Sequence, residues 1–252
     1  MPTKPTEPFT HRYPNATYSY LTDVDVSSLT TGLDTAFLLL VNKANPLPDG
    51  YEPSNLVTLT CKTNKSMKLD ARAAAALYEM MDEMAAAGID DVLVTSAYRT
   101  FDYQQNLYNK YIANEQKTIS KEAYAFFDYE YIYQNYLTQQ KHALSYEDAV
   151  AVAQYYSAPP KTSEHHTGLC VDFITEDMGG ILDERFAEKD AYAWLLQNAH
   201  QFGFILRYPA EKESVTGYIY EPWHYRFVGR EAATDIYDSG LTLEEYLTAL
   251  GM

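Results

Sequence analysis

The chain has 252 residues, of which 46% are hydrophobic and 21% charged, which is enough for one globular domain with a sizeable core. A formal net charge of -16 argues against a nucleic-acid partner and against adhesion to an anionic membrane, because both need a basic surface. No apolar run is long enough to cross a bilayer and no signal-peptide segment is visible, so work outside the cell would require an export or anchor segment absent from this sequence.

The pattern along the chain predicts an α+β fold. Residues 1–35 are polar and rich in Thr and Pro, which predicts an extended N-terminal arm ahead of a domain at 36–252. Within that domain, short apolar runs predict strands at 37–41, 92–95, 169–174, 204–207 and 217–220. Helical spacing predicts helices at 70–87, 103–111, 145–156, 185–202 and 242–250, with a tyrosine-rich helical insertion at 113–144. Helices alternating with short strands favour a small antiparallel sheet flanked by helices.

The chain has only two cysteines, Cys61 and Cys170, which is too few for a disulfide scaffold. The sequence favours two free, buried thiols, and a bridge between them stays open.

The first segment that carries chemistry is Ser163–Asp172, which reads SEHHTGLCVD. His165 and Asp172 are separated by a glycine and the start of a strand, an arrangement that suits metal ligands gathered from a loop and the strand after it. Nitrogen and oxygen donors fit zinc better than a soft metal. The alternative is a solvated histidine pair with Asp172 as a cap, and the spacing alone does not decide between them.

The second segment is Glu221-Pro222-Trp223-His224. His224 can serve as a third ligand, leaving an open position for water, and Glu221 can accept the proton of that water. The alternative is an aromatic core corner that contains a buried, hydrogen-bonded histidine.

A third segment, Ser96-Ala97-Tyr98-Arg99-Thr100, follows a predicted strand. Arg99 could bind a substrate carboxylate or stabilise an oxyanion, and a structural salt bridge explains it equally well. Motifs for serine catalysis and for phosphate binding are absent from the sequence. Cys170 is conceivable as a nucleophile, but a small buried neighbour of the metal is the simpler role.

Taken together, these motifs resemble the VanY-type zinc D-alanyl-D-alanine carboxypeptidases. The resemblance rests on the pattern Ser163-x-His165-x-x-Gly168-x-Cys170-x-Asp172, on Glu221-x-Trp223-His224, and on the block from Ser96 to Thr100 with Gln104. It covers about residues 38–229. It implies a zinc-peptidase fold shared with the Hedgehog signalling domain and the D-Ala-D-Ala dipeptidases.

The resemblance also implies a role for each matching residue. His165, Asp172 and His224 would hold Zn²⁺, Glu221 would be the catalytic base, and Arg99 would stabilise the tetrahedral intermediate. Substrate-binding residues would be Ser163, Gln104, Tyr98, Ser96 and Trp223. Two features depart from the family: Cys170 stands where alanine is usual, and the segment 113–144 is longer and richer in tyrosine, which makes it the candidate determinant of substrate preference.

The resulting hypothesis is a monomeric enzyme, secreted or in the cell envelope, that removes the C-terminal D-alanine from peptidoglycan stem peptides, with no nucleic-acid or protein partner. Two alternatives stay open. One is an L,D-carboxypeptidase acting on tetrapeptide stems, which shares these motifs. The other is an inactive wall-binding module that keeps zinc for structure, although such a module would need neither Glu221 nor Arg99.

Overall fold

The computed structural model describes residues 33–252, and it confirms the α+β class. The central sheet has four antiparallel strands in the order β3-β4-β6-β5: β3 Val92–Ser96, β4 Cys170–Thr175, β6 His224–Phe227 and β5 Phe204–Leu206. A separate antiparallel pair is formed by β1 Leu56–Thr58 and β2 Lys68–Asp70. The predicted N-terminal arm lies outside the described residues except for 33–35.

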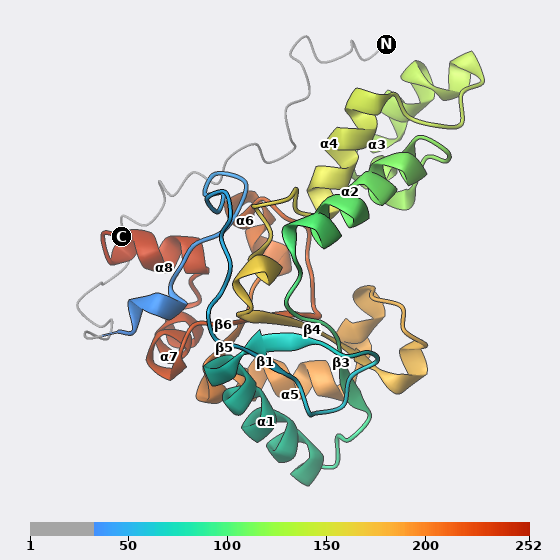
Figure 1. Cartoon of the computed structure of the whole chain (residues 1–252). Coiled ribbons are helices and arrows are strands. Elements are labelled where there is room, and N and C mark those ends of the chain that lie inside the picture. The colour runs from blue at the N-terminus through green and yellow to red at the C-terminus, as the bar shows by residue number, and fades with distance from the viewer. Residues whose placement is uncertain (1–32) are drawn as a thin grey trace.

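Strand periodicity divides the central sheet into an apolar and a polar face. Side chains alternate along a strand, so Val171 and Phe173 of β4 share one face with Tyr225 of β6. These three residues belong to the main core, which also includes buried residues of α1 Ala71–Ala86 and α5 Asp190–Asn198. Figure 1 shows both helices packed beneath the sheet. The other face of β4 and β6 carries Cys170, Asp172, His224 and Arg226, so the functional residues share the face opposite the core.

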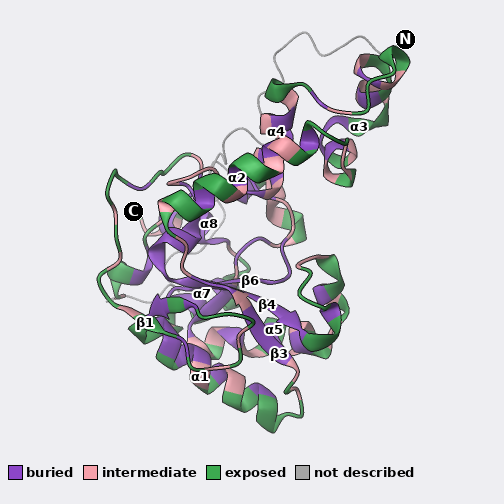
Figure 2. Cartoon of the chain, turned by 45° about the vertical axis from the view of Figure 1, so that its right-hand side comes forward, coloured by how far each residue is buried: buried purple, intermediate pink, exposed green. Residues whose placement is uncertain are grey.

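Three helices form a lobe that projects from the polar side of the sheet (Figure 1). They are α2 Phe101–Glu115, α3 Lys121–Asn135 and α4 Tyr146–Tyr156, and they share their own apolar cluster. Figure 2 shows that this lobe buries a stripe of residues while much of its outer surface is exposed. The segment 113–144, predicted as a helical insertion, contributes α3 and the end of α2 to this lobe.

The C-terminal part closes the remaining edge of the sheet. Helices α7 Arg230–Ser239 and α8 Leu243–Ala249 pack with residues of β5 in a third cluster, and the short α6 Glu213–Thr216 precedes β6. The Thr242 hydroxyl and the Glu245 carboxylate form a capping box at the start of α8. No helix within residues 33–252 is long and apolar enough to cross a membrane.

Most predicted elements are confirmed, and two predicted strands are wrong. Residues 37–41 form no strand, because the carbonyls of Phe37 and Leu39 accept hydrogen bonds from the Arg226 guanidinium rather than from a neighbouring strand. Residues 217–220 also form no strand. Gly217 ends α6 with a φ of 77°, and the strand begins later, at His224. The helix predicted at 185–202 is α-helical only over α5 and is flanked by 3-10 turns.

Candidate active site

Three chain segments meet on the polar face of the sheet. The 3-10 turn Glu164–Thr167 leads into β4, Asp172 of β4 pairs with His224 of β6, and Asp172 also lies opposite Ser96 at the end of β3. Gly168 ends the turn with a φ of 67°, and a Cβ at this position would lie 2.6 Å from Leu56 Cδ2. A glycine is therefore required for the turn to pack against β1 and to place His165 beside Asp172.

His165, Asp172 and His224 converge in the structure, as the sequence predicted. His165 Nε2 lies 3.2 Å from Asp172 Oδ2, and His224 Nδ1 lies 3.0 Å from Asp172 Oδ1. All three residues are buried. His165 Nδ1 lies 2.7 Å from the carbonyl oxygen of Ala97, which can only accept, so Nδ1 carries a proton and Nε2 is the nitrogen available to a metal.

The geometry of these donors fits a zinc ion. Four ligands about 2.0–2.1 Å from a tetrahedral Zn²⁺ lie roughly 3.3 Å from one another, close to the separations observed here. Asp172 Oδ1 is buried and makes no hydrogen bond of acceptable geometry among the described residues; its close neighbour at 3.0 Å is His224 Nδ1, which is itself a predicted ligand atom. A buried carboxylate oxygen without a partner is unfavourable unless a cation satisfies it. The unsatisfied atom therefore points to a metal.

Cys170 adds a sulfur to the same site. Donor atoms of His165, Cys170 and His224 all lie within 4.8 Å of one another. Burial alone would raise the pKa of the Cys170 thiol, but charge on the two histidines lowers it to about 7. Both cysteines are free, as the sequence favoured, but only Cys170 is buried, while Cys61 is half-buried.

Glu221 lies in the loop before β6, on the wall of the same site. Its backbone N–H donates to the Tyr208 carbonyl at 3.0 Å, and its Oε2 lies 3.5 Å from His224 Nδ1. Burial raises the pKa of Glu221 to about 7. A carboxyl group with a pKa near neutrality can both accept and donate a proton at physiological pH.

Arg99 is held by three side chains at the end of β3. Its Nε donates to Ser96 Oγ at 2.9 Å, Nη1 to Gln104 Oε1 at 3.2 Å and Nη2 to Asp172 Oδ2 at 3.1 Å. The amide nitrogen of Gln104 donates in turn to the Ala158 carbonyl at 2.7 Å. Arg99 thus forms the salt bridge that the sequence left as one alternative, and its side chain is still 17% exposed at the site.

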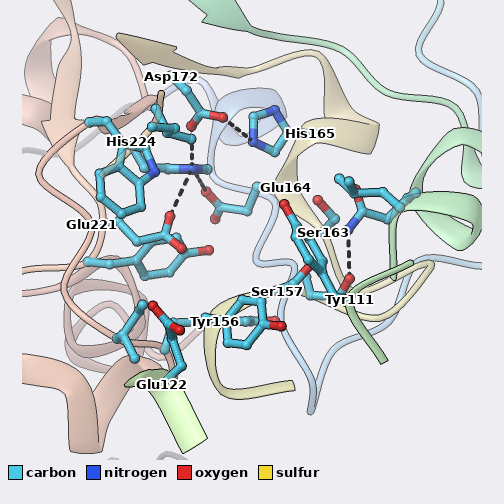
Figure 3. A pocket seen from close by; sticks show the side chains of 18 of the residues that line it. Tyr111, Glu122, Tyr156, Ser157, Ser163, Glu164, His165, Asp172, Glu221 and His224 are labelled. Atoms are coloured by element: carbon cyan, nitrogen blue, oxygen red, sulfur yellow. Dashed lines mark hydrogen bonds and ion pairs between the residues drawn. The ribbon is translucent and has the colours of Figure 1, made fainter. Parts of the chain in front are cut away.

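A cavity of about 400 Å³ connects this site to the helical lobe. Three of the predicted substrate-binding residues line it: Ser163, Gln104 and Trp223. The other two line a neighbouring cavity of about 370 Å³: Ser96 and Tyr98. Figure 3 shows the far end of the main cavity, where Tyr156 and Glu122 lie away from the three predicted ligands.

Sequence reasoning missed several lining residues, among them Glu164. Its carboxylate is fully buried and pairs with Arg207 and Arg226. A signal was present in the sequence, since Arg207 directly follows the apolar run Phe204–Leu206, Arg226 lies between two aromatic residues, and a buried guanidinium needs an acidic partner. The sequence did not identify that partner. Tyr208 and Tyr218 were also missed as lining residues; Tyr218 was predicted to lie in a strand at 217–220 that the structure does not form.

The chain is similar to known carboxypeptidases. The family model described as VanY, D-alanyl-D-alanine carboxypeptidase, matches residues 66–230. A D-alanyl-D-alanine carboxypeptidase of Enterococcus faecalis is 37% identical over 210 residues, which cover 83% of this chain and 65% of that protein. The chain spans just under two thirds of the length of this protein and of a second relative, the putative carboxypeptidase YodJ of Bacillus subtilis.

Solved structures show the same likeness. The vancomycin-resistance D,D-pentapeptidase VanY in complex with Zn(II) is 36% identical, with a TM-score of 0.62 over 84% of this chain and 99% of that one. The LdcB L,D-carboxypeptidase is 32% identical, with a TM-score of 0.65 over 87% of this chain and 92% of that one.

Proposed function

Since the chain belongs to the VanY family of D-alanyl-D-alanine carboxypeptidases, we propose that it is a zinc-dependent peptidase that removes the C-terminal D-alanine from peptidoglycan stem peptides. The observation that carries the proposal is the convergence of three buried donors, His165, Asp172 and His224, on a cavity that also contains Glu221. The zinc complex of the neighbouring VanY structure supports the same choice of metal.

In this proposal His165, Asp172 and His224 hold the zinc ion. When bound, zinc supplies a Lewis acid that polarises the scissile carbonyl and acidifies a water molecule. Glu221 accepts the proton of the attacking water at its carboxylate and then donates a proton to the leaving amine of D-alanine. Its burial keeps the carboxylate from being solvated, so the proton passes within the site.

Arg99 is proposed to balance the negative charge that develops on the carbonyl oxygen. Ser96 and Gln104 fix its guanidinium, so that little reorganisation is needed when the charge appears. The positions of Ser96 and Gln104 thus support a role in holding Arg99 rather than in direct contact with substrate. Ser163 and Trp223 remain proposed contacts for the terminal residue of the peptide.

Peptidoglycan lies outside the cytoplasmic membrane, so we propose that the enzyme acts there. Absence of protein and nucleic-acid partners and a monomeric state remain predictions from the sequence.

Stem-peptide preference is the second point to settle. The similarity to the LdcB L,D-carboxypeptidase is as extensive as that to VanY, and this favours an L,D-carboxypeptidase as the second candidate. The zinc-loaded chain should be incubated with defined pentapeptide and tetrapeptide stems, with Glu221→Gln as the inactive control, and released D-alanine measured. Release from the pentapeptide supports the main proposal, and release from the tetrapeptide alone supports the second candidate. No release from either would favour a binding module.

A further inference from the structure

His224 uses its two ring nitrogens in different environments. Nδ1 faces the metal site, 3.0 Å from Asp172 Oδ1, while Nε2 lies on the opposite side of the ring, 3.5 Å from Glu164 Oε2. Figure 3 shows the Glu164 carboxylate beside the His224 ring. Neither Nε2 nor Oε2 has another hydrogen-bond partner among residues 33–252, and both are buried. Two unsatisfied polar atoms facing each other are a donor and acceptor pair that needs only a small ring rotation to close.

We propose that Glu164 is a positioning residue for the metal site: its carboxylate holds the Nε2–H tautomer of His224, so that Nδ1 is the nitrogen that binds the metal. The proposal rests on the zinc site assigned above. It concerns which atom of His224 is the ligand and which residue selects that atom.

The Glu164 carboxylate is held in place on its other side by two arginines. Glu164 Oε1 accepts hydrogen bonds from Arg207 Nε and from Arg226 Nη1, each at 2.8 Å. This arrangement occupies one oxygen fully and leaves Oε2 for His224. Burial alone would raise the pKa of Glu164, but the two guanidiniums hold it well below its ordinary range, so the group stays an acceptor.

The two arginines are fixed in turn, because their other nitrogens also donate hydrogen bonds to buried groups. Arg226 donates to the carbonyls of Phe37 and Leu39 through Nη2 at 3.1 and 2.8 Å. Arg207 forms a bidentate salt bridge with the Glu244 carboxylate of α8, in which Nη1 donates to Oε2 at 2.7 Å and Nη2 donates to Oε1. The two carboxylates and two guanidiniums balance in charge, and all four side chains are fully buried. Such a network fixes Glu164 more firmly than a single ion pair would.

The two histidine ligands are therefore oriented by different acceptors. The Ala97 carbonyl accepts a hydrogen bond from Nδ1–H of His165 and leaves Nε2 for the metal. Glu164 is the acceptor that faces Nε2–H of His224 and leaves Nδ1 for the metal. A carboxylate that accepts from a ligand histidine also raises the basicity of that ligand. Loss of such a partner typically costs roughly 10- to 100-fold in metal affinity.

The test compares two substitutions in the same buried network. Glu164→Gln and Glu244→Gln each remove one carboxylate that pairs with Arg207, but only Glu164 faces His224. Zinc affinity of the full chain should be measured by competition with a chromophoric chelator, and stability by denaturant unfolding. Both variants should lose stability. Glu164→Gln should bind zinc roughly 10- to 100-fold more weakly, and Glu244→Gln should stay within about 3-fold of the unchanged protein.

A second measurement needs no variant and covers the case in which Glu164→Gln does not fold. Long-range ¹H–¹⁵N correlation spectra of the zinc-loaded, ¹⁵N-labelled chain identify which ring nitrogen of each histidine binds metal. The expected result is Nδ1 for His224 and Nε2 for His165. Coordination of His224 through Nε2, or equal zinc affinities of the two variants, would overturn the proposal. Failure of the unchanged protein to bind zinc would instead overturn the proposed function.

Discussion

Replacement of Glu221 by glutamine tests the proposed mechanism most directly. The substitution keeps the shape of the side chain and removes its ability to accept a proton. The two other carboxylates beside His224 are not free to take over, because Asp172 is engaged by Arg99 and Glu164 by two arginines. We therefore expect kcat to fall by roughly 10²- to 10⁴-fold, the usual contribution of a general base.

This loss corresponds to about 2.7–5.5 kcal/mol of transition-state stabilisation. The upper half of the range is expected, since the Glu221 side chain is only 12% exposed and bulk water has little access to replace it. Zinc content should not change, because the predicted ligands are three other residues. KM should change much less than kcat, since the lost interaction is one that the transition state makes.

The assay is steady-state release of D-alanine from a stem pentapeptide by the zinc-loaded chain, with metal content measured on the same samples. Glu184→Gln is the matched control, because Glu184 is an exposed carboxylate that does not line the cavity. An unchanged kcat would refute the assignment of Glu221 as the base. Loss of zinc together with activity would show that Glu221 is a ligand.

Three further predictions concern the same structure. Gly203→Ala should lower the free energy of unfolding by about 2–4 kcal/mol in urea titrations, because φ is 85° and the new Cβ would lie 2.8 Å from Phe227 Cε2. Gly88→Ala, with a φ of 86° and open space around it, should cost only about 1 kcal/mol, and equal losses would contradict the packing argument. Arg99→Lys keeps the positive charge but loses the planar guanidinium and its fixed set of donors, so kcat should fall roughly 10- to 1000-fold. An unchanged kcat would count against oxyanion stabilisation by Arg99. In metal-free protein, burial raises the pKa of Glu221 from 4.5 to about 7, so folding favours its protonated form. Unfolding free energy should therefore fall as pH rises from 4.5 to 7, by up to ~3 kcal/mol relative to Glu221→Gln, and parallel pH profiles would refute this.

Local pattern was sufficient for most of the elements and for the composition of the site. The helical spacing of residues 70–87, ended by Gly88, predicted α1, because spacing and stop signal lie close together in the chain; the structure adds that Asp70 caps the start of the helix. His165 and Asp172 were identifiable for the same reason, since a turn, a glycine and a strand start lie within one short segment. The strand predicted at 217–220 failed because apolar residues after Gly217 pack as a loop, and periodicity over four residues cannot tell these apart.

The sequence by itself determined which residue types are available for metal binding and proton transfer, since these are set by composition and short motifs. Tertiary structure alone decided how they are used. Pairing of β4 with β6 places His224 opposite Asp172, and the end of β3 brings Arg99 to the same carboxylate. Tertiary structure also placed Glu164 between His224 and two arginines, Arg207 just after β5 and Arg226 in β6. Such contacts join residues more than 40 positions apart, and only the packed fold specifies which buried charge meets which partner.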